Sequence, residues 1–153
     1  MKKMVLFIVG CLLLVVVFAQ EVSGTGIIGK WYTVEDKSIV EIRQVNDKFF
    51  GNIVWLKEPM EEKDPTKAKV DDENPDISLR ARPIVGVEFL KDFKYDDKAN
   101  KWVDGVIYNP EDGKTYYCYM LIEKDGRLFV RGSIDAWGWV GKTQYWTRTP
   151  SVK

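Results

Sequence analysis

The feature that most constrains this fold is a series of short alternating segments bracketed by two tryptophan motifs. Gly29-Lys30-Trp31 opens the series after an apolar leader, and Trp146-Thr147-Arg148 closes it. Extended segments recur between them about every 8 to 12 residues with turn residues in the gaps, a spacing typical of antiparallel barrels and sandwiches. The bracketing predicts an all-β, up-and-down antiparallel barrel of about eight strands, with room for a packed interior or one small ligand.

Eight segments carry the β-branched and aromatic residues that strands favour. In the third of them, alternation puts Phe49, Ile53 and Trp55 on one face. Turn residues at 46–47, 109–113 and 124–126 separate neighbouring segments. No segment after the leader shows a convincing helical period. We therefore predict strands over residues 27–34, 38–45, 48–56, 84–95, 101–108, 115–123, 127–132 and 142–148.

The first nineteen residues have the layout of an export signal. Two lysines precede an apolar run over residues 4–18, and Ala19 provides the small residue of a cleavage site. The run is shorter than the roughly 20 residues that a membrane-spanning helix needs, so we expect cleavage before Gln20 rather than retention as an anchor. Lipid attachment at Cys11 is a further alternative. Residues 20–153 are then expected to form one secreted or periplasmic domain with no membrane span.

Composition argues against several classes of function. The chain has 23 basic and 23 acidic residues, and this near neutrality argues against nucleic-acid binding. It has no histidine, which removes the commonest general base and metal ligand, and with them Ser-His-Asp and Cys-His catalysis. Cys118 is the one cysteine left after leader cleavage, and we expect a buried apolar group rather than a reactive thiol. The prediction is a protein that is not an enzyme and needs no cofactor.

The interval over residues 57–83 interrupts the rhythm of strands, because it is long, charged and rich in proline. Loops of this length are usually either functional or disordered. Its acidic residues could offer oxygen ligands to calcium, but they lack the spacing and the turn glycine of an EF-hand. A carboxylate pair for glycoside hydrolysis needs rigid elements that a proline-rich loop does not promise. We expect a solvated acidic surface, with no metal site, from Asp64, Asp71, Asp72, Glu73 and Asp76.

Arg80 and Arg82 flank Ala81, so in an extended chain both side chains point the same way. One interpretation is an anion clamp over the barrel mouth, since a guanidinium pairs well with carboxylate or phosphate. The alternative is that the arginines pair with acidic residues of their own loop and pin the loop to the barrel.

Aromatic residues are the second set of candidates for ligand contact. They either line an apolar pocket with a few polar tips or fill the core and the ends of the barrel. Trp137 and Trp139 flank a glycine before the last strand, so they lie at a rim or plug the barrel. The candidate ligand-binding residues are Arg80, Arg82, Trp55, Tyr108, Tyr117, Tyr119, Trp137 and Trp139.

Several motifs give the chain a resemblance to a secreted bacterial family. They are Gly29-Lys30-Trp31, Asn74-Pro75, residues 79–83 with Gly86, residues 105–116, Arg131-Gly132 and Trp146-Thr147-Arg148. Together they resemble the family called domain of unknown function 2147. The resemblance implies an exported barrel similar to lipocalins and fatty-acid-binding proteins, with Trp31 packed beneath Arg148 at the closed end. The residues implied to be structural are Gly29, Trp31, Asn74, Pro83, Gly86, Pro110, Gly113 and Arg148.

These observations lead to one expected function and two alternatives. The first is an exported, non-enzymatic carrier or sensor that holds an amphipathic or anionic small molecule in the barrel, with an arginine on its polar head. The second is a structural or interaction module of the cell envelope, with a solidly packed barrel and a protein partner. The third, an enzyme, requires ionisable groups with perturbed pKa values converging in a cleft, and no such signature is present.

Overall fold

The computed structural model describes residues 24–150, so the expected signal sequence and its cleavage site lie outside the described residues. Eight strands form a closed barrel in which each strand pairs antiparallel with the next. Among the described residues, no helix has the length and apolar character needed to cross a membrane. The strands are β1 (Gly29–Tyr32), β2 (Ser38–Val45), β3 (Lys48–Leu56), β4 (Glu88–Asp96), β5 (Lys101–Asn109), β6 (Lys114–Ile122), β7 (Leu128–Ser133) and β8 (Gly141–Arg148).

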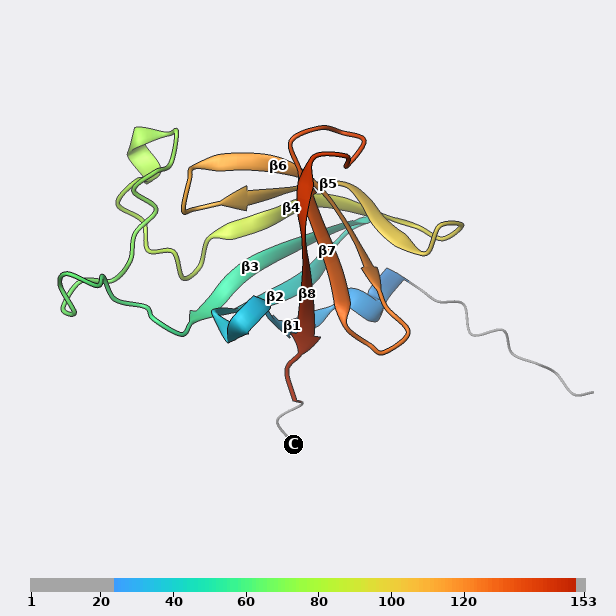
Figure 1. Cartoon of the computed structure of the whole chain (residues 1–153), viewed down its shortest axis with the longest axis horizontal. Helices are drawn as coiled ribbons and strands as arrows, with labels where there is room; N and C mark the ends of the chain where they lie inside the picture. The colour runs from blue at the N-terminus through green and yellow to red at the C-terminus, as the bar shows by residue number, and fades with distance from the viewer. Residues whose placement is uncertain (1–23, 151–153) are drawn as a thin grey trace, which may run out of the picture.

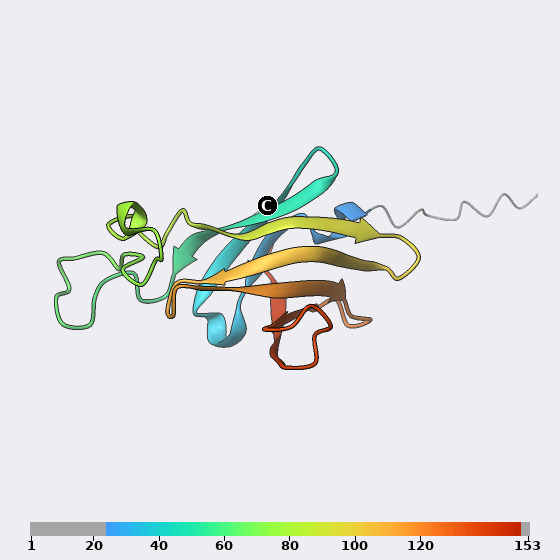
Figure 2. The ribbon, with the colours of Figure 1, turned by 90° about the horizontal axis from the view of Figure 1, so that it is seen from above.

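The predicted barrel is confirmed, and its closure depends on the two tryptophan motifs. β1 pairs with β8 through the partners Trp31 with Arg148 and Tyr32 with Thr147. A short 3-10 helix, η1 (Gly24–Ile27), precedes β1. Figure 1 shows η1 and the segment 57–83 at opposite ends of the molecule, and Figure 2 shows β4, β5 and β6 side by side between them. The start of the domain therefore covers one end of the barrel, and the longest loop extends from the other end.

The end near η1 is sealed by apolar packing and by indole hydrogen bonds. Trp31 and Trp102 are almost completely buried there. The Trp31 Nε1–H donates to the Ile27 carbonyl at 2.8 Å, and the Trp102 Nε1–H donates to the Gly24 carbonyl at 3.0 Å. Each buried indole thus keeps a hydrogen-bond partner, which a buried N–H needs. We call this end the closed end.

Two strands begin two or more residues later than predicted, whereas the other six lie within one residue of the prediction. The reason is local in each case. β1 is shorter than predicted because the chain before Gly29 forms η1. β4 begins at Glu88 rather than residue 84. The preceding chain turns instead, with the Ile84 N–H donating to the Lys69 carbonyl at 3.0 Å and the Gly86 N–H donating to the Ile53 carbonyl at 2.7 Å.

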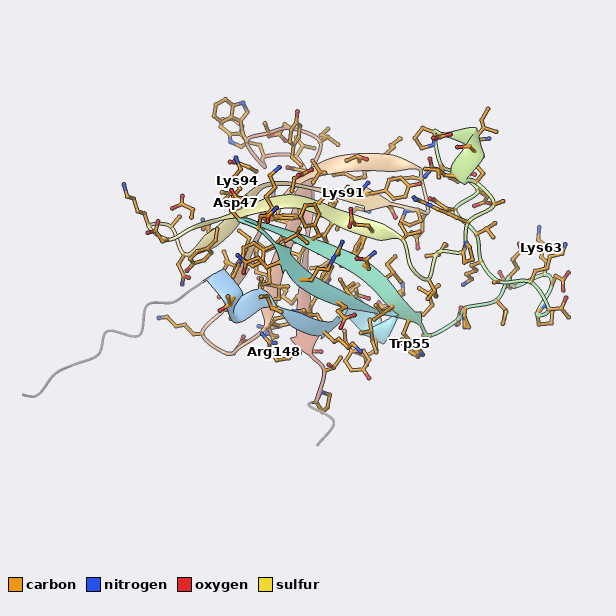
Figure 3. The ribbon with its side chains drawn as sticks, turned by 180° about the vertical axis from the view of Figure 1, so that it is seen from behind. Asp47, Trp55, Lys63, Lys91, Lys94 and Arg148 are labelled. Carbon is orange, nitrogen blue, oxygen red and sulfur yellow. The ribbon has the colours of Figure 1, made fainter. Side chains whose placement is uncertain are left out.

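A β-bulge in β3 makes one predicted facing wrong. β2 pairs Ile39 with Trp55 but Val40 with Ile53, so Val54 is an extra residue in β3. An extra residue reverses the alternation beyond it. Ile53 is therefore buried while Trp55 is 42% exposed, and Figure 3 shows Trp55 at the margin of the barrel. Trp55 packs edge-on against Tyr32 outside the barrel, with ring centroids 6.5 Å apart.

The segment 57–83 folds back on itself and is fastened by backbone pairing. Isolated bridges join Met60 to Ala68 and Val70 to Pro83. The Asp71 N–H donates to the Arg82 carbonyl at 3.0 Å. Asp76 caps the start of the short 3-10 helix η3 (Ile77–Leu79), where its side chain accepts a hydrogen bond from the Ser78 N–H. The long loop is thus an ordered lobe built on the end of the barrel opposite η1.

Candidate functional site

The barrel contains a cavity of about 1230 Å³ that opens at the end opposite η1. Its rim comes from the connections that follow β1, β3, β5 and β7, because alternate connections of an up-and-down barrel lie at the same end. We call this the open end. Ligand pockets for small molecules typically span about 300 to 1,000 Å³, so the cavity together with its mouth is large enough for one such ligand.

Apolar side chains form the inner part of the cavity. Ile53, Phe89, Val130 and Trp146 line it from four different strands, and all four are buried. Phe89 and Trp146 stack on each other with ring centroids 6.1 Å apart. This part of the wall offers no charged side chain, so it suits the apolar body of a ligand.

Charged side chains gather at the mouth instead. Glu35 pairs with Lys37 at 3.0 Å and Glu58 with Lys69 at 3.8 Å. Lys57 and Lys142 also line the cavity, and within residues 24–150 neither has a carboxylate at ion-pair distance. The site therefore has an apolar interior and a polar, charge-bearing entrance, a division that matches an amphipathic molecule.

A buried carboxylate fastens the long loop beside this cavity. Asp71 is completely buried. Its Oδ1 accepts a hydrogen bond from the Tyr108 hydroxyl at 2.5 Å, and its Oδ2 accepts bonds from Asn74 Nδ2 at 2.7 Å and from Arg82 Nη2 at 2.7 Å. Tyr108 is on β5, whereas the other three residues belong to the segment 57–83. We call these four side chains the latch.

Burial and hydrogen bonding act in opposite directions on the latch carboxylate. Burial raises the pKa of Asp71, but hydrogen bonds from Tyr108, Asn74 and Arg82 outweigh it, so the pKa lies below its ordinary value. Burial and the neighbouring carboxylate raise the pKa of Tyr108 to about 12. At neutral pH the latch thus consists of a charged carboxylate, a charged guanidinium and a neutral phenol.

The turn between β5 and β6 makes a second contact with the long loop. Gly113 has φ +65°, and a Cβ built on it would lie 1.9 Å from the Glu73 carbonyl oxygen. No other residue fits this turn, since a side chain would require both an unfavourable φ and displacement of the neighbouring backbone. The motifs around Asn74 and around residues 105–116 therefore meet in space and hold the loop to the barrel.

The two candidate arginines do not lie in the cavity wall. Arg82 binds Asp71 through both Nε and Nη2, at 2.9 and 2.7 Å. Arg80 donates from Nε to the Asn74 carbonyl at 2.7 Å. Neither residue lines the cavity. Of the two interpretations of this pair, the contacts agree with the second, in which the arginines satisfy acceptors of their own loop.

Tyr117 and Tyr119 are also placed outside the cavity. Cys118 lies between them and is buried in the interior, so strand alternation turns both tyrosines outward. Tyr117 is 52% exposed, and Tyr119 stacks on Phe129 with ring centroids 5.7 Å apart. Burial raises the pKa of the Cys118 thiol. The thiol is thus a packed apolar group, and Tyr108 is the candidate aromatic residue that does line the cavity.

Trp137 and Trp139 lie on the loop between β7 and β8, at the rim. They are 84% and 85% exposed and do not line the cavity. Of the two alternatives for this pair, the structure shows the rim position and not the plug.

Arg148 covers Trp31 at the closed end. The guanidinium carbon lies 4.2 Å from the centroid of the indole, and Nη1 donates to the Ile28 carbonyl at 3.0 Å. Figure 3 shows Arg148 beneath the barrel, beside η1. The pair matches the arrangement implied by the family motifs, and neither residue lines the cavity.

The acidic residues of the long loop serve local roles. Asp64 accepts from the Thr66 hydroxyl at 2.6 Å, Asp76 accepts from the Ser78 hydroxyl at 2.7 Å, and Asp71 belongs to the latch. In the part of the chain from 24 to 150, no three cysteine, aspartate or glutamate side chains are grouped so that they could hold a metal ion.

Sequence reasoning missed the inner wall of the cavity. Ile107, Val130 and Gln144 line it, although none was a candidate. The alternation within β5, β7 and β8 could have identified them, because each lies two positions from a buried residue of its strand and therefore faces the same side of the sheet. Which end of each strand reaches the mouth depends on the closed barrel and is not visible in one strand alone.

Comparison with known proteins agrees with the motifs and the barrel. The family described as "Uncharacterized protein conserved in bacteria (DUF2147)" matches residues 29–148. Protein HP1028 from the human pathogen Helicobacter pylori, a solved structure described as belonging to the lipocalin family, is 34% identical to this chain. The similarity covers 81% of this chain and 83% of that chain, with a TM-score of 0.70. None of the curated proteins matches the chain. The protein therefore belongs to the DUF2147 family, and its closed eight-stranded barrel is of the lipocalin type.

Proposed function

We propose that this protein binds an amphipathic small molecule, holding its apolar body inside the barrel and its polar end at the mouth. The observation that carries the proposal is the cavity of about 1230 Å³ with apolar inner walls and a charged rim. An interior solidly filled by side chains would have favoured a purely structural barrel. The lipocalin type of fold supports the same conclusion, because barrels of this size can enclose one ligand.

The polar end of the ligand is proposed to lie near Lys57 and Lys142. Both line the mouth and lack a carboxylate partner among the described residues, whereas Lys37 and Lys69 are paired. A carboxylate or phosphate head could therefore be bound there without breaking an existing ion pair. Arg82, by contrast, can reach a ligand only by giving up Asp71.

Binding rather than catalysis is proposed because the carboxylates beside the cavity whose pKa values are shifted are already held by hydrogen-bond donors. Asp71 is held by three donors, and Asp112 accepts from the Tyr116 hydroxyl at 2.5 Å. The thiol of Cys118 is buried and its pKa is raised. A carrier needs none of these groups to react.

The test uses a dansylated undecanoic acid as fluorescent probe, with Ile107→Trp as the blocking variant. Ile107 lines the cavity, so an indole there should fill the space and weaken probe binding by at least about tenfold, the loss expected when roughly 50 to 100 Å² of apolar contact is removed. Val106→Trp is the matched control, because Val106 pairs with outward-facing Tyr117. Equal binding by both variants would show that the probe does not enter the barrel.

The charge of the polar head is tested with the double variant Lys57→Gln/Lys142→Gln. It should weaken the acid probe several-fold and leave a dansylated alkyl alcohol of the same length unaffected. If binding of the acid and of the alcohol weakens to the same degree, the two lysines do not bind the polar head of the ligand.

The site of action is proposed to be the periplasm or the exterior of the cell, after cleavage before Gln20. The support is the apolar leader of the sequence. Fractionation of the native host, with the mature N-terminus determined by mass spectrometry, tests this. A protein that keeps its first nineteen residues, or one that is lipid-modified at Cys11, contradicts it.

A further inference from the structure

The loop between β7 and β8 exposes an unusual amount of apolar surface. Trp137 and Trp139 are 84% and 85% exposed, and Ile134 and Val140 are 66% and 59% exposed. Single exposed apolar residues are ordinary, but a contiguous group marks a surface that contacts protein or membrane. We call residues 134–140 the indole loop.

The indole loop is held in place by hydrogen bonds rather than left slack. The Asp135 carboxylate accepts from the Trp139 N–H at 3.0 Å and from the Val140 N–H at 2.7 Å. Arg131, on β7, donates from Nε to the Gly138 carbonyl at 2.8 Å and from Nη2 to the Trp139 carbonyl at 3.2 Å. These hydrogen bonds order the backbone of the loop and so hold the two indoles in solvent, although burying them would be favourable in free energy.

The same loop forms part of the cavity mouth. Ile134 and Val140, at its two ends, line the cavity, as does Lys142 just beyond it. Whatever the indoles contact is consequently brought to the entrance of the barrel. This position separates the indole loop from Trp55, whose exposed indole lies on the outer wall.

We propose that Trp137 and Trp139 insert into the headgroup region of a phospholipid bilayer and bring the cavity mouth against the lipid. The inference rests on the proposed function, because an amphipathic ligand partitions into membranes and a docked mouth could exchange it there. Tryptophan favours the membrane interface, where its ring is apolar and its N–H stays solvated.

The size and charge of the indole loop favour a bilayer over a protein partner. A stable protein interface buries about 800 Å² on each partner, whereas two indoles supply at most about 150 to 250 Å² each. Asp135 is the single ionisable residue of the loop, and its oxygens are occupied by backbone amides. The rim carries both acids and lysines, so insertion of the indoles, not attraction between charges, should drive binding.

The experiment measures co-flotation of the full domain, residues 20–153, with phosphatidylcholine vesicles. We expect weak, reversible binding that changes little between low and high salt. The double variant Trp137→Ala/Trp139→Ala should weaken it by at least about tenfold, given the apolar area removed. Trp55→Ala is the matched control, since it deletes an exposed indole that lies outside the indole loop and packs against Tyr32 on the outer wall, and it should bind as the wild type does. Quenching of tryptophan emission by brominated lipid should likewise vanish in the double variant alone.

Three outcomes overturn the proposal: no binding of the wild type to vesicles, equal loss in Trp55→Ala, or a wild-type dimer that the double variant converts to monomer without any vesicle binding. The last would assign the indole loop to a second copy of the chain. Binding of the dansylated acid probe is measured in parallel and should survive the double substitution, because neither indole lines the cavity. Vesicle binding without probe binding would reject the proposed function and support membrane docking by the indole loop. Probe binding without vesicle binding would reject membrane docking alone.

Discussion

The closed end of the barrel buries the indoles of Trp31 and Trp102, whereas the open end buries the carboxylate of Asp71. The closed end is held by apolar packing, with Trp31 and Trp102 donating to the carbonyls of η1 and Arg148 lying over Trp31. The open end is held by the latch, in which one charged group accepts from three donors.

The difference between the ends matches what each must do. An end that only has to exclude water can be filled by apolar groups, which pack densely and need few exact partners. An end that must remain hollow has no core to hold its loop, so directional hydrogen bonds must do it instead. The open end is therefore ordered without being filled, and a cavity lies beside a fixed loop.

The largest effect should come from the closed end. Trp31→Ala removes a fully buried indole and the surface that Arg148 covers, and it should lower the free energy of unfolding by about 3 to 5 kcal/mol. Trp55→Ala, at an indole that is 42% exposed, should cost under about 1 kcal/mol. Urea unfolding monitored by circular dichroism measures both. Similar losses in the two variants would mean that the closed end is not the stabilising core described above.

A smaller and more local effect is expected from the latch. Asp71→Asn removes the charge that Arg82 and Tyr108 bind, and it should lower the free energy of unfolding by roughly 2 to 3 kcal/mol. Limited proteolysis should show faster cleavage within residues 57–83. Asp72→Asn is the control, because Asp72 is exposed and takes no part in the latch. If the long loop remains as resistant as in the wild type, the latch does not hold it.

The smallest effect concerns the titration of Tyr108, whose pKa is raised to about 12 from about 10 in the unfolded chain. The folded protein therefore retains the phenolic proton that the unfolded chain loses, so this group's contribution to stability is complete below pH 10 and is lost as the pH rises through 12. Ultraviolet titration of wild type minus Tyr108→Phe isolates this group. A difference curve centred near pH 10 would show that Tyr108 is not buried against Asp71.

The errors made from sequence alone have a common physical origin. Trp55 was predicted to share a face with Ile53, and a bulge at Val54 separates them. Tyr117 and Tyr119 were grouped with Tyr108 by residue type, yet Cys118 occupies the inward position between them. Whether a side chain faces the interior depends on the alternation along its strand, and a single inserted residue reverses that alternation. The sequence of one strand does not show where such a residue is inserted.

The pairing of Arg82 with Asp71 was an alternative that sequence reasoning could name but not select. The two residues are eleven positions apart, and their contact requires Tyr108, Asn74 and the Gly113 turn to arrive at the same place. Such a convergence depends on loops closing over a barrel end. Composition and residue spacing alone therefore do not predict which acidic residue Arg82 contacts.

The number and order of the strands and the turns between them could be predicted from the sequence alone. Those features follow from local preferences, namely alternation, β-branching and turn residues, which act within a few positions along the chain. The tertiary structure alone decided which end stays hollow, which side chains line it and which loop carries two indoles to its rim. Those features depend on contacts between residues distant in sequence, where one bulge or one buried carboxylate changes the outcome.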